Sequence, residues 1–188
     1  VPYATCNLNL AEVYRFMKKF DKIEELYLET MEIYQKNNLQ NDYLYASVCN
    51  NLGLFYQDTE RFQDALDLHK KSLEILEKLP EYKLQYATTL SNMVLPYLKT
   101  GEKEKSEDVL DKSLKLIENT VGKEHGLYSA SLNNMAIQYY NEGEFEKALK
   151  YFEESAEICK KSFGENSGNY KSLLQNIEIV KERLGKNE

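Results

Sequence analysis

The sequence contains no tryptophan, only three prolines and only eight glycines in 188 residues. An all-β fold needs many tight turns, which glycine and proline form most readily, so this composition argues against such a fold. The three cysteines, Cys6, Cys49 and Cys159, do not have the spacing of a zinc site. An odd number of cysteines on amphipathic segments predicts reduced, half-buried thiols, and therefore a cytoplasmic protein.

Several classes of function also lack their sequence signals. The chain has no long uncharged apolar run and no signal peptide, so no contact with a membrane is predicted. The net charge of −7 and the dispersed basic residues argue against nucleic acid as a partner. No nucleophile elbow, phosphate-binding loop or dinucleotide fingerprint occurs. We therefore predict no enzyme activity, no catalytic residues, no metal site and no cofactor.

What the chain does contain is an internal repeat of about 42 residues. A tyrosine recurs at spacings of 42, 41, 42 and 42 residues, and an asparagine recurs at the same spacings. The tyrosines are Tyr3, Tyr45, Tyr86, Tyr128 and Tyr170, and the asparagines are Asn9, Asn51, Asn92, Asn134 and Asn176. A repeat of this length indicates a stack of similar units that bury their apolar faces against each other.

Each unit is predicted to be a helical hairpin. In the stretch from Tyr128 to Cys159, apolar residues recur with helical spacing on both sides of a turn at Gly143, which can adopt a positive φ. The predicted repeats cover residues 3–42, 43–85, 86–127 and 128–169. The predicted helix pairs are 3–18 with 20–36, 45–58 with 61–78, 86–99 with 103–119, and 128–141 with 145–163, followed by a capping helix at 170–184.

The pattern resembles the tetratricopeptide repeat (TPR). Leu52-Gly53-x-x-Tyr56 matches its first helix, and Ala148-x-x-x-Phe152-x-x-Ser155 matches its second helix. The period of about 42 residues, longer than the usual 34 or so, is similar to that of kinesin light chain and related bacterial proteins. The resemblance implies an all-α, right-handed superhelical solenoid of four helix pairs plus a capping helix, as a single domain over residues 1–188. Further repeats or another domain are expected upstream of Val1.

Charge is distributed unequally between the two helices of each unit. The first helices contain no charged residue over Tyr45–Gln57, Tyr86–Leu98 and Tyr128–Asn141, whereas the second helices carry many. The second helices therefore keep a solvated face. In the family that the chain resembles, first helices line the concave surface, so that surface is expected to be uncharged and rich in amide and hydroxyl groups.

The recurring asparagine has two interpretations. Asparagine is a mediocre helix former, so its repetition in one register requires a reason. Its side chain either bonds to the backbone of an extended peptide or ties one helix to its neighbour. In the proteins that the chain resembles, this position holds peptide backbones, which implies a peptide-binding role for Asn51, Asn92 and Asn134.

Helical spacing adds further candidates for the same groove. Leu54, Leu95 and Ile137 lie one turn after the asparagines, and Tyr140 and Asn141 lie further along the fourth repeat. Pro96 removes the backbone hydrogen bond to the Asn92 carbonyl and is predicted to kink its helix. One interpretation is that a ligand or a water molecule donates a hydrogen bond to the freed carbonyl. The other is that the kink only adjusts the curvature of the superhelix. His69 replaces an aromatic residue and is predicted to be packed and hydrogen-bonded.

The leading functional hypothesis is a scaffold that binds a protein or an extended peptide in the concave groove. A second hypothesis is a structural or oligomerisation module, with a homodimer formed through the N-terminal repeat. A third is the ligand-sensing regulatory domain of a larger signalling protein, because the chain also resembles bacterial receptors for signalling peptides.

Overall fold

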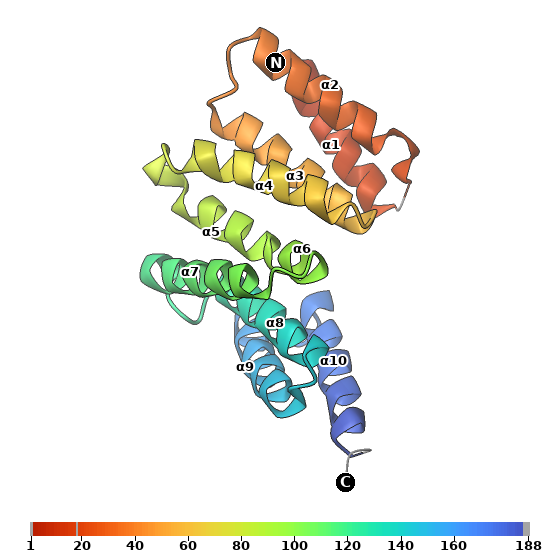
Figure 1. Ribbon diagram of the computed structural model, residues 1–188, viewed down its shortest axis with the longest axis vertical. Coiled ribbons are helices and arrows are strands. Elements are labelled where there is room, and N and C mark those ends of the chain that lie inside the picture. The colour runs from red at the N-terminus through yellow and green to blue at the C-terminus, as the bar shows by residue number, and fades with distance from the viewer. Residues whose placement is uncertain (1, 18, 186–188) are drawn as a thin grey trace. The chain divides into compact units, whose positions relative to one another are not determined.

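The computed structural model describes residues 2–17 and 19–185, and these residues form helices joined by turns, with no strand among them. The chain divides into two compact units, Val1–Glu102 and Lys103–Glu188. The predicted all-α class and the helical repeat architecture are confirmed (Figure 1). The boundary at Glu102 lies inside the third predicted repeat, and the organisation of the chain as a single domain remains a prediction.

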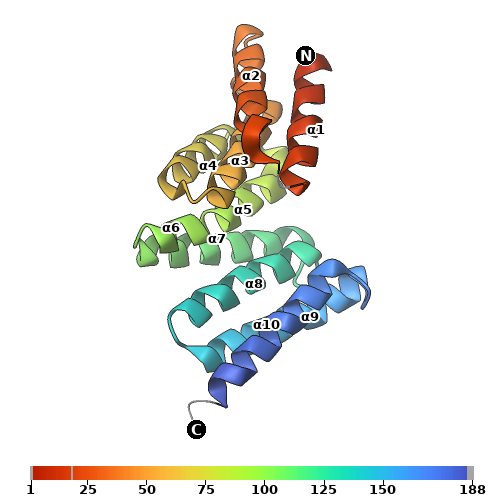
Figure 2. The ribbon, with the colours of Figure 1, turned by 90° about the vertical axis from the view of Figure 1, so that its right-hand side faces the viewer.

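The first unit contains helices α1 to α6. Each helix packs on the next along the chain, and α4 contacts both α5 and α6 (Figures 1 and 2). The α-helices are α1 (Pro2–Phe16), α2 (Ile23–Lys36), α3 (Tyr43–Asp58), α4 (Phe62–Leu76), α5 (Lys83–Asn92) and α6 (Val94–Lys99), and 3₁₀ turns precede α2 (Phe20–Lys22) and α5 (Pro80–Tyr82).

The second unit contains α7 (Lys103–Val121), α8 (Gly126–Asn141), α9 (Phe145–Phe163) and α10 (Gly168–Leu184). The chain turns from α8 into α9 at Gly143, whose φ of 80° favours glycine. The Ser167 hydroxyl caps α10 by accepting a hydrogen bond of 3.2 Å from the Tyr170 backbone N–H. These local signals place the helix ends close to where the repeat pattern predicts them.

One predicted helix is wrong. The segment predicted as a single helix from Tyr86 to Lys99 is divided, because α5 ends at Asn92 and α6 begins at Val94. Pro96 has no N–H to donate to the Asn92 carbonyl, which explains why the helix breaks at this point. The predicted end of the first helix at Lys18 lies outside the described residues.

Small residues bring the helices of each unit close together. A Cβ atom added at Gly53 in α3 would lie 2.8 Å from Cε1 of His69 in α4, which is closer than atoms can approach. The fully buried Ala65 and Ala148 play the same role in the second helices. Close helix packing of this kind fixes the positions of the side chains that lie between successive first helices.

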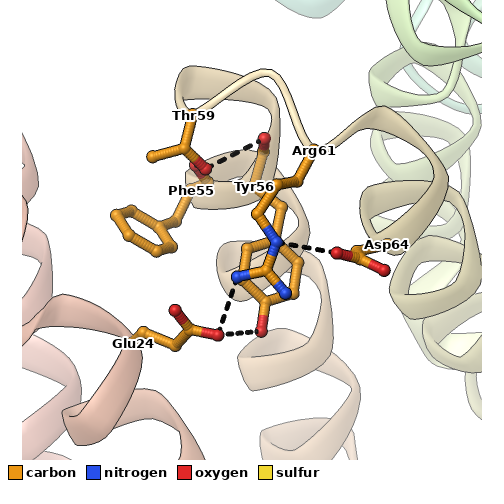
Figure 3. A network of polar contacts seen from close by, with 6 residues as sticks. All are labelled: Glu24, Phe55, Tyr56, Thr59, Arg61 and Asp64. Carbon is orange, nitrogen blue, oxygen red and sulfur yellow. Dashed lines mark hydrogen bonds and ion pairs between the residues drawn. The ribbon is translucent and has the colours of Figure 1, made fainter.

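A polar network joins α2, α3 and α4 within the first unit (Figure 3). The Arg61 guanidinium lies 3.8 Å from the Tyr56 ring centroid and donates to Glu24 at 2.8 Å and Asp64 at 2.7 Å. The Tyr56 hydroxyl also donates to Glu24, at 2.7 Å. Burial works against the charged form of Glu24, but these hydrogen bonds outweigh it and lower the pKa of the carboxyl.

Candidate functional site

Two cavities occupy equivalent places in the two units, each between two first helices and above a second helix. The cavity of the first unit measures about 180 Å³ and is lined by Tyr43, Ser47, Asn50, Asn51, Ser72, Leu76, Gln85, Thr88 and Thr89. The cavity of the second unit measures about 240 Å³ and is lined by Gly126, Ser129, Ala130, Asn133, Ser155, Cys159, Phe163, Asn169, Ser172, Leu173 and Asn176.

The equivalence of the two cavities follows from the repeat. Asn50 and Asn133 lie 83 residues apart, as do Ser72 and Ser155, which corresponds to two repeat lengths. None of the lining residues of either cavity is charged. Both therefore offer amide and hydroxyl groups, which can each donate and accept hydrogen bonds without favouring either sign of charge.

The two cavities differ in how the serine of the second helix is bonded. Ser155 and Ser129 are both buried, and each hydroxyl donates to the other residue's carbonyl at 2.8 Å. At the position equivalent to Ser129, the first unit has Ala46, which has no polar group. The Ser72 hydroxyl is consequently buried without a hydrogen-bond partner. A buried hydroxyl in this state is costly, and it lies at the wall of a cavity.

A hydrogen-bond network beside the first cavity uses Asn92. The Asn92 side chain donates to Asn50 Oδ1 at 3.1 Å, so this asparagine ties α5 to α3. Its carbonyl accepts from Gln57 Nε2 at 2.9 Å. The hypothesis that ligand or water satisfies this carbonyl is therefore wrong, because Gln57 supplies the missing donor.

The same Gln57 amide lies 2.8 Å from Nε2 of His69 and donates to it. The predicted packing and hydrogen bonding of His69 are confirmed, although its Nδ1 is buried without a partner. Burial lowers the pKa of the imidazole to about 4, so the ring is neutral at physiological pH.

A third cavity, of about 240 Å³, adjoins the uncharged cavity of the second unit. Apolar side chains dominate its lining, which consists of Ile137, Tyr140, Phe152, Asn176, Ile179 and Val180. Asn176 lines both cavities, so an amide group separates a polar recess from an apolar one. This arrangement can hold a backbone group and an apolar side chain close to each other.

A fourth cavity, of about 410 Å³, is charged and is lined mostly by second helices and the turn between α2 and α3. Lys71 and Gln35 both donate to the Tyr45 hydroxyl, at 3.0 Å and 2.7 Å. The bond with Tyr45 raises the pKa of the Lys71 ammonium. This cavity therefore has a different chemistry from the three described above.

The structure brings together some of the residues predicted for the groove. Asn51 lines the first uncharged cavity, Asn92 contacts another residue of its lining, and Ile137 and Tyr140 line the apolar cavity. The remaining predicted residues lie outside the four cavities: Leu54, Leu95 and Asn134 are half-buried and Asn141 is exposed.

Sequence reasoning missed Asn50 and Asn133, which line the two uncharged cavities. A signal for them exists, since both begin an Asn-Asn pair and the two pairs are separated by two repeats. Within residues 2–17 and 19–185, no cluster of histidine, cysteine and acidic side chains has the arrangement of a metal site. No helix in that part of the chain combines the length and apolar character needed to cross a membrane.

A family model described as tetratricopeptide repeat matches residues 3–78, 44–119 and 127–188. The chain belongs to the tetratricopeptide repeat family. TPR units generally act as scaffolds for protein–protein interaction, and this coarse role applies to the chain. None of the curated proteins matches this sequence.

Solved structures similar to this TPR chain are kinesin light chain-like repeat proteins. BtubC (BKLC) from P. vanneervenii has a TM-score of 0.72 at 18% identity, covering 94% of this chain and 70% of that chain. A kinesin light chain-like protein of Podospora anserina with nearly identical TPR-like repeats has a TM-score of 0.72 at 17% identity, covering 97% and 87%. Its Q17M form gives 0.73 at 16% identity, covering 97% and 86%. These similarities confirm that the repeats have the fold of kinesin light chain-like repeats, whereas a bacterial origin remains a prediction.

Proposed function

We propose that this TPR chain holds an extended segment of a partner protein against its first helices. The observation that carries the proposal is the pair of equivalent, uncharged cavities, each lined by asparagine amides and hydroxyl groups. An extended peptide presents an N–H and a carbonyl at each residue, and an asparagine side chain can bond to both. Each unit by itself therefore has a recess with the chemistry that suits an extended backbone.

The lining also favours particular ligand side chains. A charged side chain would lose hydration in either uncharged cavity without gaining an ionic partner, so neutral residues are favoured there. The apolar cavity beside Asn176 suits an aliphatic or aromatic side chain next to the bonded backbone. We therefore expect the ligand to be a neutral segment with at least one large apolar residue.

The proposed contact residues are the predicted set, extended by Asn50 and Asn133. The predicted set consists of Asn51, Asn92, Asn134, Leu54, Leu95, Ile137, Tyr140 and Asn141. Asn92 already bonds to Asn50, so a ligand at this point would meet a pair of linked amides. Such a pair is held in place before binding, which lowers the entropic cost of ordering the side chains.

An array of short synthetic peptides tests the proposal. The array is probed with the wild type and with a triple variant carrying Asn51→Ala, Asn92→Ala and Asn134→Ala. Asn119→Ala, an exposed position on the second-helix segment α7, is the matched control. We expect neutral peptides with an apolar residue to bind the wild type and the control, and to lose most of their signal on the triple variant. Peptides that bind all three proteins equally would exclude Asn51, Asn92 and Asn134 as the binding element.

The predictions about location, enzyme activity, dimerisation and ligand sensing are also proposals. The three free cysteines support a reducing, cytoplasmic location, and the scaffold needs no enzyme activity of its own. A structural module that forms a homodimer through the N-terminal repeat would scatter light as a dimer at high concentration. A ligand-sensing regulatory domain would require a catalytic or DNA-binding segment elsewhere in the same gene.

A further inference from the structure

The charged cavity of the first unit has no part in the proposed peptide site. It measures about 410 Å³, within the range of about 300–1,000 Å³ that small-molecule sites have. Its charged lining residues are Lys71, Glu74 and Lys78, and Tyr45 and Gln35 are among its uncharged polar ones. It shares no lining residue with the other three cavities. A ligand of this cavity would therefore occupy a site of its own.

A buried tyrosine holds two hydrogen-bond donors at this cavity. Tyr45 is 0% exposed, and its hydroxyl oxygen accepts from Gln35 Nε2 at 2.7 Å and from Lys71 Nζ at 3.0 Å. Lys71 is thus held by a neutral group, so its positive charge and its remaining N–H groups are available to a ligand. Because both donors are fixed before binding, less entropy is lost when a ligand binds to them.

The three charged groups of the cavity do not neutralise one another. Glu74 follows Lys71 by three residues and precedes Lys78 by four, spacings at which opposite charges on a helix commonly pair. Among the residues that the structure describes, none of the three has an ion-pair partner. On the same helix, by contrast, Lys70 pairs with Asp67 at 3.8 Å. Two cations and one anion at the cavity are therefore available to a ligand.

The second unit shows that this charge pattern is not a general feature of the repeat. The equivalent positions, 83 residues later, carry four glutamates and two lysines: Glu118, Lys123, Glu124, Glu154, Glu157 and Lys161. Both lysines are paired there, Lys123 with Glu118 at 3.4 Å and Lys161 with Glu157 at 3.0 Å. In the first unit, amides replace two of the glutamates and Lys71 replaces a third. The excess of positive charge therefore belongs to this cavity alone of the two places.

We propose that the charged cavity binds an acidic amino acid, with its two carboxylates at Lys71 and Lys78 and its ammonium group at Glu74. Such a ligand carries the charges of the cavity with the opposite sign. Lys71 lies within α4 and Lys78 in the turn after it, so two separate anionic groups suit the lysines better than one compact anion. A phosphate group at either lysine would also be repelled by the unpaired Glu74 carboxylate. The Gln35 amide can donate to a carboxylate oxygen.

Titration with L-glutamate at constant ionic strength, followed by two-dimensional NMR of the ¹⁵N-labelled chain, tests the proposal. We expect saturable shifts of the Gln35 side-chain amide and of the backbone amides of residues 71–78. Glutarate lacks the ammonium group, and L-glutamine lacks one carboxylate. Each should bind about three- to fivefold more weakly than L-glutamate, because one ionic contact is lost.

Matched variants locate the binding. Lys71→Gln and Lys78→Gln should each weaken the binding of L-glutamate about three- to fivefold. Lys70→Gln removes the same charge from the same helix but does not line the cavity, so it should leave the affinity unchanged. Tyr45→Phe should weaken binding in the wild type and have a smaller effect in the Lys71→Gln background, since the hydroxyl acts through Lys71. Lys78→Gln decides the test if Lys71→Gln proves unfolded by circular dichroism.

Three results would overturn the proposal. The first is the absence of a saturable shift with L-glutamate. The second is equal binding of L-glutamate and inorganic phosphate, which would indicate an unspecific attraction of anions. The third is equal weakening by Lys70→Gln and Lys71→Gln, since the general charge of α4 would then explain the binding. The peptide array depends on other residues, so this proposal and the proposed function can fail independently.

Discussion

Ser72 and Ser155 show how one side chain changes an otherwise repeated site. Both serines are buried, but Ser155 is bonded to Ser129, whereas Ser72 has no partner and Ala46 occupies the position equivalent to Ser129. Ala46→Ser would recreate the serine pair of the second unit. We expect it to raise the free energy of unfolding by about 1 kcal/mol, measured by urea denaturation.

Ser129→Ala is the reverse change, and it should leave Ser155 in the state of Ser72. A loss of roughly 1–2 kcal/mol of stability is expected, because a buried hydroxyl loses its partner. If both substitutions left the urea midpoint unchanged, the missing partner of Ser72 would have no energetic consequence.

His69 predicts a pH dependence of stability. Its folded-state pKa of about 4 lies below its ordinary value of 6.5, so the unfolded chain takes up a proton before the folded chain does. The stabilising effect of the neutral ring is complete above pH 6.5. As the pH falls from 6.5 to 4, up to roughly 3 kcal/mol is lost, and the loss ends below pH 4.

His69→Phe isolates this effect, since Phe152 occupies the equivalent position in the fourth repeat. As the pH falls from 6.5 to 4, the unfolding free energy of the wild type should decrease relative to that of the variant, which has no imidazole at this position. Parallel pH profiles for the two proteins would show that His69 does not titrate as its burial requires.

At the scale of elements, the break between α5 and α6 is coupled to Gln57. Gln57→Ala removes the donor to both the Asn92 carbonyl and His69, and should cost about 2 kcal/mol. In a Pro96→Ala background, residue 96 regains an N–H that can reach the Asn92 carbonyl. A double-mutant cycle should then show about 1 kcal/mol of favourable coupling, whereas additive losses would contradict the link.

The helices themselves could largely be predicted from the sequence, because helix period, turn glycines and repeat register all act locally. Helix α9 begins and ends where the apolar pattern predicts, at Phe145 and Phe163. The division of α5 from α6 shows the limit. Pro96 was predicted to kink one helix, but the donor to the Asn92 carbonyl is Gln57, a residue far away in sequence that no local pattern reveals.

At the scale of the whole molecule, the uncharged character of the first helices was predictable, but the composition of the cavities was not. Each of the two uncharged cavities combines two first helices with one second helix, so a residue such as Ser72 enters the lining only through tertiary packing. The register also determines that Asn50, rather than Asn51 alone, lines the recess and bonds to Asn92. A shift of one residue along a helix, about 100° of rotation, is below the resolution of pattern reasoning.

The central claim is that the amides of the two uncharged cavities bind the backbone of an extended peptide. Isothermal titration of the strongest array peptide against a variant carrying Asn50→Asp and Asn133→Asp tests it most directly. Aspartate has the shape of asparagine and can still accept the bond from Asn92, but it brings a charge and cannot donate to a peptide carbonyl. The account predicts an affinity lower by about tenfold or more, with Asn119→Asp unchanged. Equal affinity for the wild type and the cavity variant would contradict it.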